Sequence, residues 1–381
     1  MLIWFDGFDA YETNQFLFPY AAQGGMGIGT NAGRFGQGGL TCGGGYNTAL
    51  QIQFNTNYTD VWTGFAVSAV SEGGYGWNGS GSYGNTVPLA GTLANGDDTI
   101  ITFASNGGYF DGFHGTCEAF ITYNALLGTW RAVRVQQVTN LVPLLITGAI
   151  GQYNMGQAQW HWIDIHYVPS LGSGTVQVYV DGNEVINVSG VQTSSWLNEI
   201  NSVYIGAPNI YGPTVTNSLG GTYDDWYILD ASTGPHNVTG LGDSRIYSLV
   251  PNRDAGPNNG VPSTGFNHYA MVDEPQNDGL TTYVQIQGIS GQEELYGTGT
   301  LPTTPSIVHA TRVLNIVEQT AGGVIAANAV VVSHSVEAQG PSQPLLSVFF
   351  SQYGIFETDP ATGVPWTYSN VNIADVGFVI A

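Results

Sequence analysis

The chain has 381 residues, a length that suits two domains or one large β-sandwich with an appendage. It carries 28 acidic residues, six arginines and no lysine, which gives a formal net charge of −22. Proteins bind nucleic acids by neutralising phosphates with basic side chains, so this charge balance argues against a nucleic-acid partner. No run of about 18 uninterrupted apolar residues occurs, so we expect no membrane-spanning segment.

The composition predicts an all-β chain. Glycine is abundant, with 54 residues, and the Leu, Glu and Lys patterns that are typical of helices are missing. Such a composition is typical of short strands joined by many turns. The N-terminal sequence MLIWFDGFDAY has no basic region before its apolar residues. We therefore interpret it as a first strand and not as a signal peptide, and we expect the mature protein to begin here.

In chain order, the first half of the sequence predicts a series of strands. Residues 2–11 form the opening strand, and the glycine-rich turn at 34–40 leads to the next one. Clusters of turn residues separate the later segments at the spacing expected of a β-sandwich. These later strands are expected at residues 59–70, 98–104, 116–123, 129–135, 141–147, 202–206 and 222–230.

Residues 72–84 are so rich in glycine that they cannot supply a core, and they predict a loop. Tyr75, Trp77 and Tyr83 are spaced along this loop by small polar residues. Exposed aromatic rings in such a position would stack on sugar rings or pack on a neighbouring subunit. The alternative is a loop that folds back over its own sandwich, and the sequence leaves both open.

The strand predicted at 160–168, WHWIDIHYV, has two distinct faces. Trp162, Asp164 and His166 share one face, because side chains alternate along a strand with period two. This strand is followed by a short link of Gly and Ser, and then by a second run in which valines alternate with polar residues.

The second run predicts a β-hairpin, because Asp-Gly-Asn at 181–183 tolerates positive φ. A two-residue loop would set Val176 opposite the polar Asn187. A three-residue loop would pair Val176 with Val188 and make one face of the hairpin wholly apolar. We favour this second register, because a slip of one residue turns every side chain to the opposite face.

The strand, the link and the hairpin VQVYVDGNEV resemble the core of concanavalin A-like jelly rolls, the group of lectins, glucanases and laminin-G domains. FDGFD near the N-terminus, GRFGQGGL at 33–40 and TYDDWYILD at 222–230 are similar to segments of laminin-G-like domains in virion proteins of tailed phages. The resemblance implies a concanavalin A-like jelly-roll domain over residues 1–232.

The polar sequence ASTGPHN at 231–237 marks a boundary, so we expect a second, smaller β-sandwich module over residues 233–381. Its blocks GDSRI, NHYA, VDE and FETDPATG are similar to the C-terminal module that follows laminin-G-like domains in structural proteins of tailed phages. Turn dipeptides predict an ordered loop at 356–366. The strands of this module are expected at residues 311–317, 329–334, 345–353 and 371–380.

Catalytic chemistry finds little support in the sequence. Glycoside hydrolysis needs two carboxylates about 5–9 Å apart, and the strand at 160–168 offers only Asp164. The retaining glucanases of this group carry a Glu-x-Asp-x-x-Glu run there, and both glutamates are missing. No GxSxG nucleophile elbow occurs, and Gly43-Gly44-Gly45 is not followed by a lysine. We therefore expect a protein that is not an enzyme.

Calcium is the one cofactor for which the sequence offers candidate ligands, and no other is expected. Hard cations bind carboxylates and carbonyls, although acidic pairs in loops are more commonly solvated. The candidates are two acidic pairs without the spacing of a recognised site, Asp97 with Asp98 and Asp224 with Asp225. The two cysteines, Cys42 and Cys117, either form a disulfide or remain buried thiols.

Composition and pattern alone indicate an acidic, all-β protein of two modules. The phage resemblance implies a virion structural protein, tail-associated or head-decorating, that acts in assembly and surface contact. Its partners would be other virion proteins and copies of itself, because the edges of sandwich sheets must be paired or covered. The competing interpretation is a lectin-type virion protein that binds host-surface glycan through the aromatic loop, at Tyr75, Trp77 and Tyr83.

Overall fold

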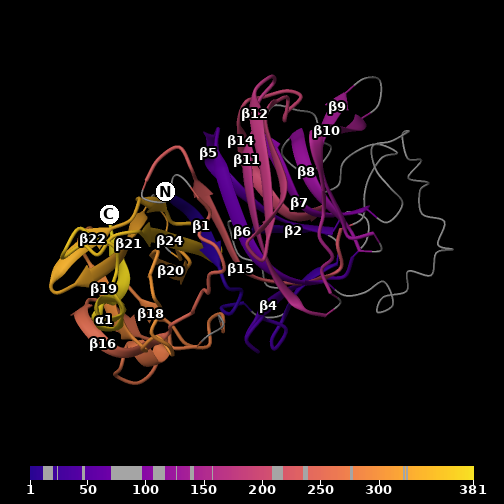
Figure 1. Ribbon diagram of the computed structural model, residues 1–381. Coiled ribbons are helices and arrows are strands. Elements are labelled where there is room, and N and C mark those ends of the chain that lie inside the picture. Colours follow the sequence, from indigo (N-terminus) through magenta and orange to yellow (C-terminus); the bar gives the residue numbers. More distant parts are fainter. Residues whose placement is uncertain are drawn as a thin grey trace. The chain divides into compact units, whose positions relative to one another are not determined.

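The structure of the protein is a computed structural model (Figure 1). It forms two compact units. The first comprises Met1, Asp6–Phe8 and Thr13–Arg245, and the second Leu2–Phe5, Asp9–Glu12 and Ile246–Ala381. The residues that the structure describes are 1–11, 20–23, 25–44, 48–69, 97–105, 116–125, 127–137, 141–156, 158–207, 218–234, 239–274, 278–320, 322 and 325–381.

The first unit contains two antiparallel β-sheets, and β1 (Leu2–Asp6) opens the chain (Figure 1). One sheet, here called the front sheet, has the strand order β13 (Asn183–Val191), β12 (Gly174–Val180), β11 (Trp160–Val168), β6 (Val61–Ala69), β15 (Gly221–Asp230), β4 (Gly39–Cys42) and β3 (Met26–Gly29). The other, the back sheet, has the order β10 (Leu141–Gln152), β9 (Thr129–Gln137), β8 (Thr116–Asn124), β7 (Asp97–Ser105), β14 (Ile200–Ala207), β5 (Thr48–Tyr58) and β2 (Tyr20–Gln23).

The two sheets pack face to face around an aromatic and aliphatic core. Tyr167 of β11 stacks on Phe103 of β7 with ring centroids 4.5 Å apart, and both side chains are fully buried. Ile163 and Ile165 of β11 alternate with outward-facing residues and are buried as well. Two antiparallel sheets packed in this way make the predicted jelly-roll β-sandwich.

The β12–β13 hairpin has the predicted residue pairing, but its loop is shorter than predicted and a β-bulge makes up the difference. Val176 lies opposite Val188. The loop itself has only two residues, Asp181 and Gly182, both with positive φ (50° and 76°), as a type I′ turn requires. A β-bulge then leaves Val185 without a partner residue and shifts the register by one. The bulge, and not a longer loop, therefore restores the apolar pairing.

Most strands of the first unit lie where the sequence predicts them. β11 has the predicted bounds, whereas β10 continues to Gln152, past its predicted end at 147. β5 is a strand of eleven residues that the sequence analysis does not predict. Strand periodicity therefore locates most strands of this unit, but it misses β5 and does not fix the residue at which each strand ends.

The second unit is also built of β-strands and is smaller. Its main sheet has the order β16 (Pro251–Asn258), β19 (Glu293–Thr298), β25 (Asp375–Ile380), β21 (Ala326–Ser333) and β22 (Val336–Gln339), with β23 (Gln343–Pro344) beside β21. Two further pairs are β20 (Thr311–Val317) with β24 (Phe350–Phe356) and β17 (Val261–Pro262) with β18 (Val284–Gln285), and η1 (Tyr269–Met271) is a short 3₁₀ turn.

The β20–β24 pair packs on one face of the main sheet, which makes a second sandwich. Val313 of β20 and Phe356 of β24 share a core with Val331 of β21 and with Trp366. The loop at 356–366 is ordered as predicted, since the indole Nε1 of Trp366 donates to the carbonyl of Phe356 at 2.9 Å.

One predicted strand of the second unit is wrong in part. Residues 371–380 do not form a single strand, because α1 (Tyr368–Ile373) is a helix and β25 begins only at Asp375. The hydroxyl of Thr367 caps this helix by accepting the N–H of Asn370 at 3.2 Å. The strand expected at 345–353 is likewise shifted, because β24 begins at Phe350.

In the part of the chain that the structure describes, we find no helix with the length and apolarity that crossing a membrane requires.

Candidate functional site

Several interacting polar and aromatic side chains lie together on the outer face of the front sheet. Asp164 of β11 lies opposite Gly64 of β6, and Gly64 lies opposite Tyr227 of β15. A Cβ atom on Gly64 would lie 2.3 Å from Cε1 of Tyr227 and 2.5 Å from Oδ1 of Asp164. Glycine at this position therefore lets the tyrosine and the carboxyl meet across the intervening strand.

Both oxygens of Asp164 are hydrogen-bonded. The hydroxyl of Tyr227 donates to Oδ1 at 2.6 Å, and the indole Nε1 of Trp162 donates to Oδ2 at 2.9 Å. Burial raises the pKa of Asp164 to about 6, against the lowering effect of these two bonds, and the charge of Asp243 raises it further. A pKa near neutrality is what proton transfer would need, but the carboxyl is only 7% exposed.

A short segment of chain covers this carboxyl. We call residues 239–245 the strap. The N–H of Leu241 donates to the hydroxyl of Tyr227 at 2.9 Å. Gly240 lies so close to the sheet that a Cβ on it would be 2.7 Å from the Tyr227 hydroxyl and 3.1 Å from Oδ1 of Asp164. The strap therefore separates Asp164 from solvent.

Arg34 holds the strap from the other side. Its guanidinium binds the carboxylate of Asp243 in a two-pronged pair, with N–O distances of 2.5 and 2.6 Å. Its backbone N–H donates to Asp224 at 2.7 Å. The carboxylate of Asp225 is 3.9 Å from the same guanidinium. The guanidinium of Arg34 thus binds Asp243 and lies near Asp225, while the backbone N–H of the same residue binds Asp224.

A second set of outward side chains extends from the strap toward the hairpin. Trp62 of β6 stacks on His166 of β11 with centroids 4.5 Å apart and an interplanar angle of 3°. The two ring nitrogens of His166 lie 2.7 Å from Asp60 and 2.9 Å from Gln177. Tyr179 of β12 packs beside Trp62 at 6.1 Å.

The outer side of the β12–β13 hairpin continues this set with exposed hydrogen-bonding groups. Gln177 donates to Asn187 at 3.3 Å, and Asn187 donates to Glu184 at 2.9 Å. Tyr179 donates to the same carboxylate at 3.2 Å. We call Gln177, Tyr179, Glu184 and Asn187 the polar hairpin face.

The candidate calcium ligands lie in two separate places. Asp97 accepts two bonds from Arg131, at 2.6 and 2.7 Å, and one from Asn124. Asp98, its neighbour on β7, is half-buried. Asp224 and Asp225 lie at a bulge of β15 beside Arg34, where burial raises the pKa of Asp224 to about 6. Among the described residues, no three acidic, histidine or cysteine side chains gather as a metal site, so calcium remains a prediction.

The remaining predicted residues lie elsewhere. Tyr75, Trp77 and Tyr83 fall outside the described residues. Cys42 and Cys117 are both free and buried, one in each sheet. The structure thus has the buried thiols and not the disulfide. Burial raises the pKa of the Cys42 thiol to about 11.

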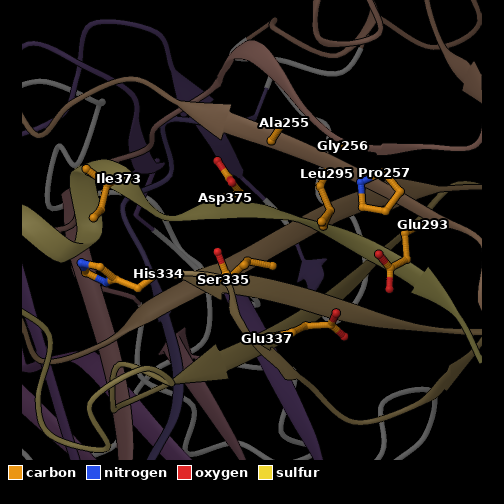
Figure 2. Close-up of a pocket in the computed structure, with 11 residues that line it drawn as sticks. Ala255, Gly256, Pro257, Glu293, Leu295, His334, Ser335, Glu337, Ile373 and Asp375 are labelled. Atoms are coloured by element: carbon orange, nitrogen blue, oxygen red, sulfur yellow. The ribbon is translucent and has the colours of Figure 1, made fainter.

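The second unit has an acidic pocket of about 540 Å³ on its main sheet (Figure 2). Glu293, Glu337 and Asp375 lie along its wall, with His334 at the turn between β21 and β22. Asp375 is paired with Arg253 at 2.6 Å. Burial and the nearby charge of Glu337 raise the pKa of Glu293. Three carboxyl groups therefore line this pocket, one of them paired with an arginine.

Comparison with known proteins shows weak structural likeness only. No protein-family model and no curated protein sequence matches the chain. An endo-β-1,4-glucuronan lyase from the fungus Trichoderma reesei is 12% identical over 60% of this chain and 95% of its own, with a TM-score of 0.38. The lectin UEA-II in complex with galactose is 11% identical over 60% of this chain and 98% of its own, with a TM-score of 0.31.

A heptameric SAP-like pentraxin from Limulus polyphemus is 14% identical over 50% of this chain and 74% of its own, with a TM-score of 0.31. Likeness at this level carries no argument about what this chain binds. The residues of the front sheet must therefore support any functional proposal by themselves.

The sequence predicts the site residues of β11, but not those that other segments bring to the same place. It placed Trp162, Asp164 and His166 on a common face, which the structure bears out. It missed Tyr227 and Arg34, which reach the same place from distant parts of the chain. The sequence TGF around Gly64 offered the only local clue, since a glycine inside a strand marks a close approach.

Proposed function

We propose that the protein is a non-enzymatic structural component of a tailed-phage particle, tail-associated or head-decorating, that acts through surface contacts. The particle assignment is supported by the resemblance of GRFGQGGL, TYDDWYILD and the C-terminal blocks to virion proteins. Its partners would be other virion proteins and further copies of the chain.

The observation that carries the non-enzymatic part of this proposal is the state of Asp164. Its two oxygens already accept bonds from Tyr227 and Trp162, and Gly240 lies against it. A glycosidase would need this carboxyl open to substrate, with a second acid across the scissile bond. Asp243 of the strap is the carboxyl whose charge raises the pKa of Asp164, and it is already bound to Arg34. It is therefore not placed as that second acid.

Locating the chain in purified particles tests the particle assignment. We expect particles purified on a density gradient to contain the protein at a fixed copy number, with matching density in a cryo-EM map. Density on the head would identify a decoration protein, and density on the tail a tail-associated one. If the chain stays in the unassembled fraction while a known head protein sediments with the particles, the proposal fails.

Glycan binding is the second candidate, and the polar hairpin face favours it. Gln177, Glu184 and Asn187 form a chain of exposed hydrogen bonds beside half-buried Tyr179. Aromatic rings that adjoin such groups suit ligands with both apolar faces and hydroxyls, as sugars have.

A glycan array with the wild-type protein and two variants tests this candidate. Tyr179→Ala would remove the aromatic ring of the polar hairpin face, and Trp77→Ala would remove a ring of the loop predicted to bind. Loss of binding in one variant alone would identify the surface that is used. If the wild type retains no glycan of the array, this second candidate is wrong.

A further inference from the structure

The strap is attached to the front sheet in a way that differs from the packing of the sheet itself. None of its residues, from Thr239 to Arg245, is buried. The three side chains of the front sheet that Gly240 approaches, Trp62, Asp164 and Tyr227, are at most 7% exposed. The strap is therefore a cover on a face that would otherwise meet solvent, and it is not an element of the core.

Polar attachments hold this cover. The Leu241 N–H bonds to the Tyr227 hydroxyl, and the Asp243 carboxylate is gripped by Arg34. Arg245 closes the strap by lying 3.6 Å over the ring of Phe35. Segments with exposed hydrogen bonds and few buried apolar contacts open at lower free energy than the whole fold. Glycine at 240 and 242 further lowers the cost of changing the backbone of the strap.

We propose that the strap opens as a local unit while the sandwich stays folded, and that it controls access to the outer face of the front sheet. In the closed state the strap occupies the surface of Trp62, Asp164 and Tyr227. In the open state this surface presents two indole rings, of Trp62 and Trp162, beside a carboxyl group. This inference goes beyond the proposed function, because it assigns two states to a face that the proposed function treats as closed.

The Arg34–Asp243 pair is the latch of the strap, because it is the attachment with two short charge-assisted bonds. Asp243→Ala should release the strap and leave Arg34 beside Asp225, whereas Arg34→Ala releases the strap and also removes the cation beside that buried carboxyl. Arg253 supplies a matched control, since it forms a similar pair with Asp375 at 2.6 Å in the second unit.

Two measurements on the full-length chain test the proposal. The first is amide hydrogen exchange of Leu241, whose N–H is protected only in the closed state. The second is labelling of Asp164 with a water-soluble carbodiimide and glycine ethyl ester, which modifies accessible carboxyl groups. Both are compared in the wild type, Arg34→Ala, Asp243→Ala and the control Arg253→Ala.

We expect Arg34→Ala and Asp243→Ala to speed exchange at Leu241 about tenfold and to make Asp164 reactive, with no such change in Arg253→Ala. The amides of Ile163 and Ile165 in β11 should remain slow in every variant. Equal acceleration of strap and strand amides would mean that the strap opens only when the sandwich unfolds. Unchanged exchange at Leu241 in both latch variants, or an unreactive Asp164 in both, would overturn the proposal as well. None of these readouts depends on whether the chain is part of a particle.

Discussion

Asp164 of the first unit and the carboxyl groups that line the pocket of the second lie in opposite settings. In the first unit, Asp164 is buried, and two aromatic side chains supply a hydrogen-bond donor for each of its oxygens. In the second, Glu293, Glu337 and Asp375 line an open pocket (Figure 2). Asp375 is also paired with the half-exposed Arg253. Asp164 is held by packing and by two hydrogen bonds, whereas the carboxyl groups of the pocket are less buried and act on one another by charge.

This difference indicates which acidic groups contribute most to the stability of the fold. A buried carboxyl needs a hydrogen-bond donor for each oxygen, so the loss of one donor lowers the free energy of unfolding. Solvent screens an exposed carboxyl, so its partners contribute little to stability. Substitutions around Asp164 should therefore change folding far more than equivalent substitutions around the pocket.

The largest effect should come from filling the space between Asp164 and Tyr227. Gly64→Val places a branched side chain where even a Cβ would be 2.3 Å from the tyrosine ring. We expect a loss of about 3 kcal/mol in the free energy of unfolding, because the overpacked side chains on this face must move apart. Urea denaturation measures this loss. Gly172→Val is the control, since nothing lies within 4 Å of a Cβ there, and equal losses in both variants would contradict the prediction.

The next effect concerns pH. The pKa of Asp164 is raised from 3.8 to about 6 in the folded state, chiefly by burial. Between these pH values the folded protein keeps a proton that the unfolded chain releases, so stability falls as pH rises. At 1.36 kcal/mol per unit, this group accounts for at most about 3 kcal/mol of that fall.

Asp164→Asn should therefore reduce the slope of unfolding free energy against pH in the range from about 4 to 6. Asp224 keeps part of the slope, because burial raises its pKa to about 6 as well. Glu293→Gln should reduce the slope less than Asp164→Asn does, because Glu293 is less buried than Asp164. Chemical denaturation at a series of pH values compares the three proteins. A slope that stays the same in Asp164→Asn would show that this carboxyl titrates as it does in water.

The sequence predicted the part of this site that depends on one strand. Period-two alternation is enough to place Trp162 and Asp164 on a common face. It could not place Tyr227, because the partner of each residue on β15 depends on a bulge between Asp224 and Tyr227. The hairpin shows the same limit, since a bulge at Val185 supplies the shift that was assigned to a longer loop.

The helix α1 escaped prediction for a related reason. Val371 and Ile373 flank the polar Asn372 and so continue the alternation of the following strand toward the N-terminus. Residues 368–373 form a helix because Thr367 caps its first turn and Val371 packs into the core of the second unit. Tertiary packing therefore overrides local propensity in this segment.

A smaller difference in unfolding free energy is expected between the loss of a buried and the loss of an exposed tyrosine hydroxyl. Tyr227 donates to buried Asp164 and accepts from Leu241, whereas Tyr179 donates to the exposed Glu184. Tyr227→Phe removes one buried and one partly buried bond and should cost about 2 kcal/mol of unfolding free energy. Tyr179→Phe should cost less than about 0.5 kcal/mol. Thermal or urea unfolding ranks the two variants, and a larger loss in Tyr179→Phe would reverse the comparison of buried and exposed settings.

The smallest effect should come from the pocket itself. Arg253 is the cation that pairs with Asp375, and its side chain is 52% exposed. Solvent and salt screen such a pair, so Arg253→Ala should change the free energy of unfolding by no more than about 0.5 kcal/mol. Measurement at low and high salt distinguishes this from a structural role, because a screened pair loses its small contribution at high salt. Should Arg253→Ala cost as much as Tyr227→Phe at high salt, the acidic pocket would depend on this arginine for its packing, and the contrast between the two units would not hold.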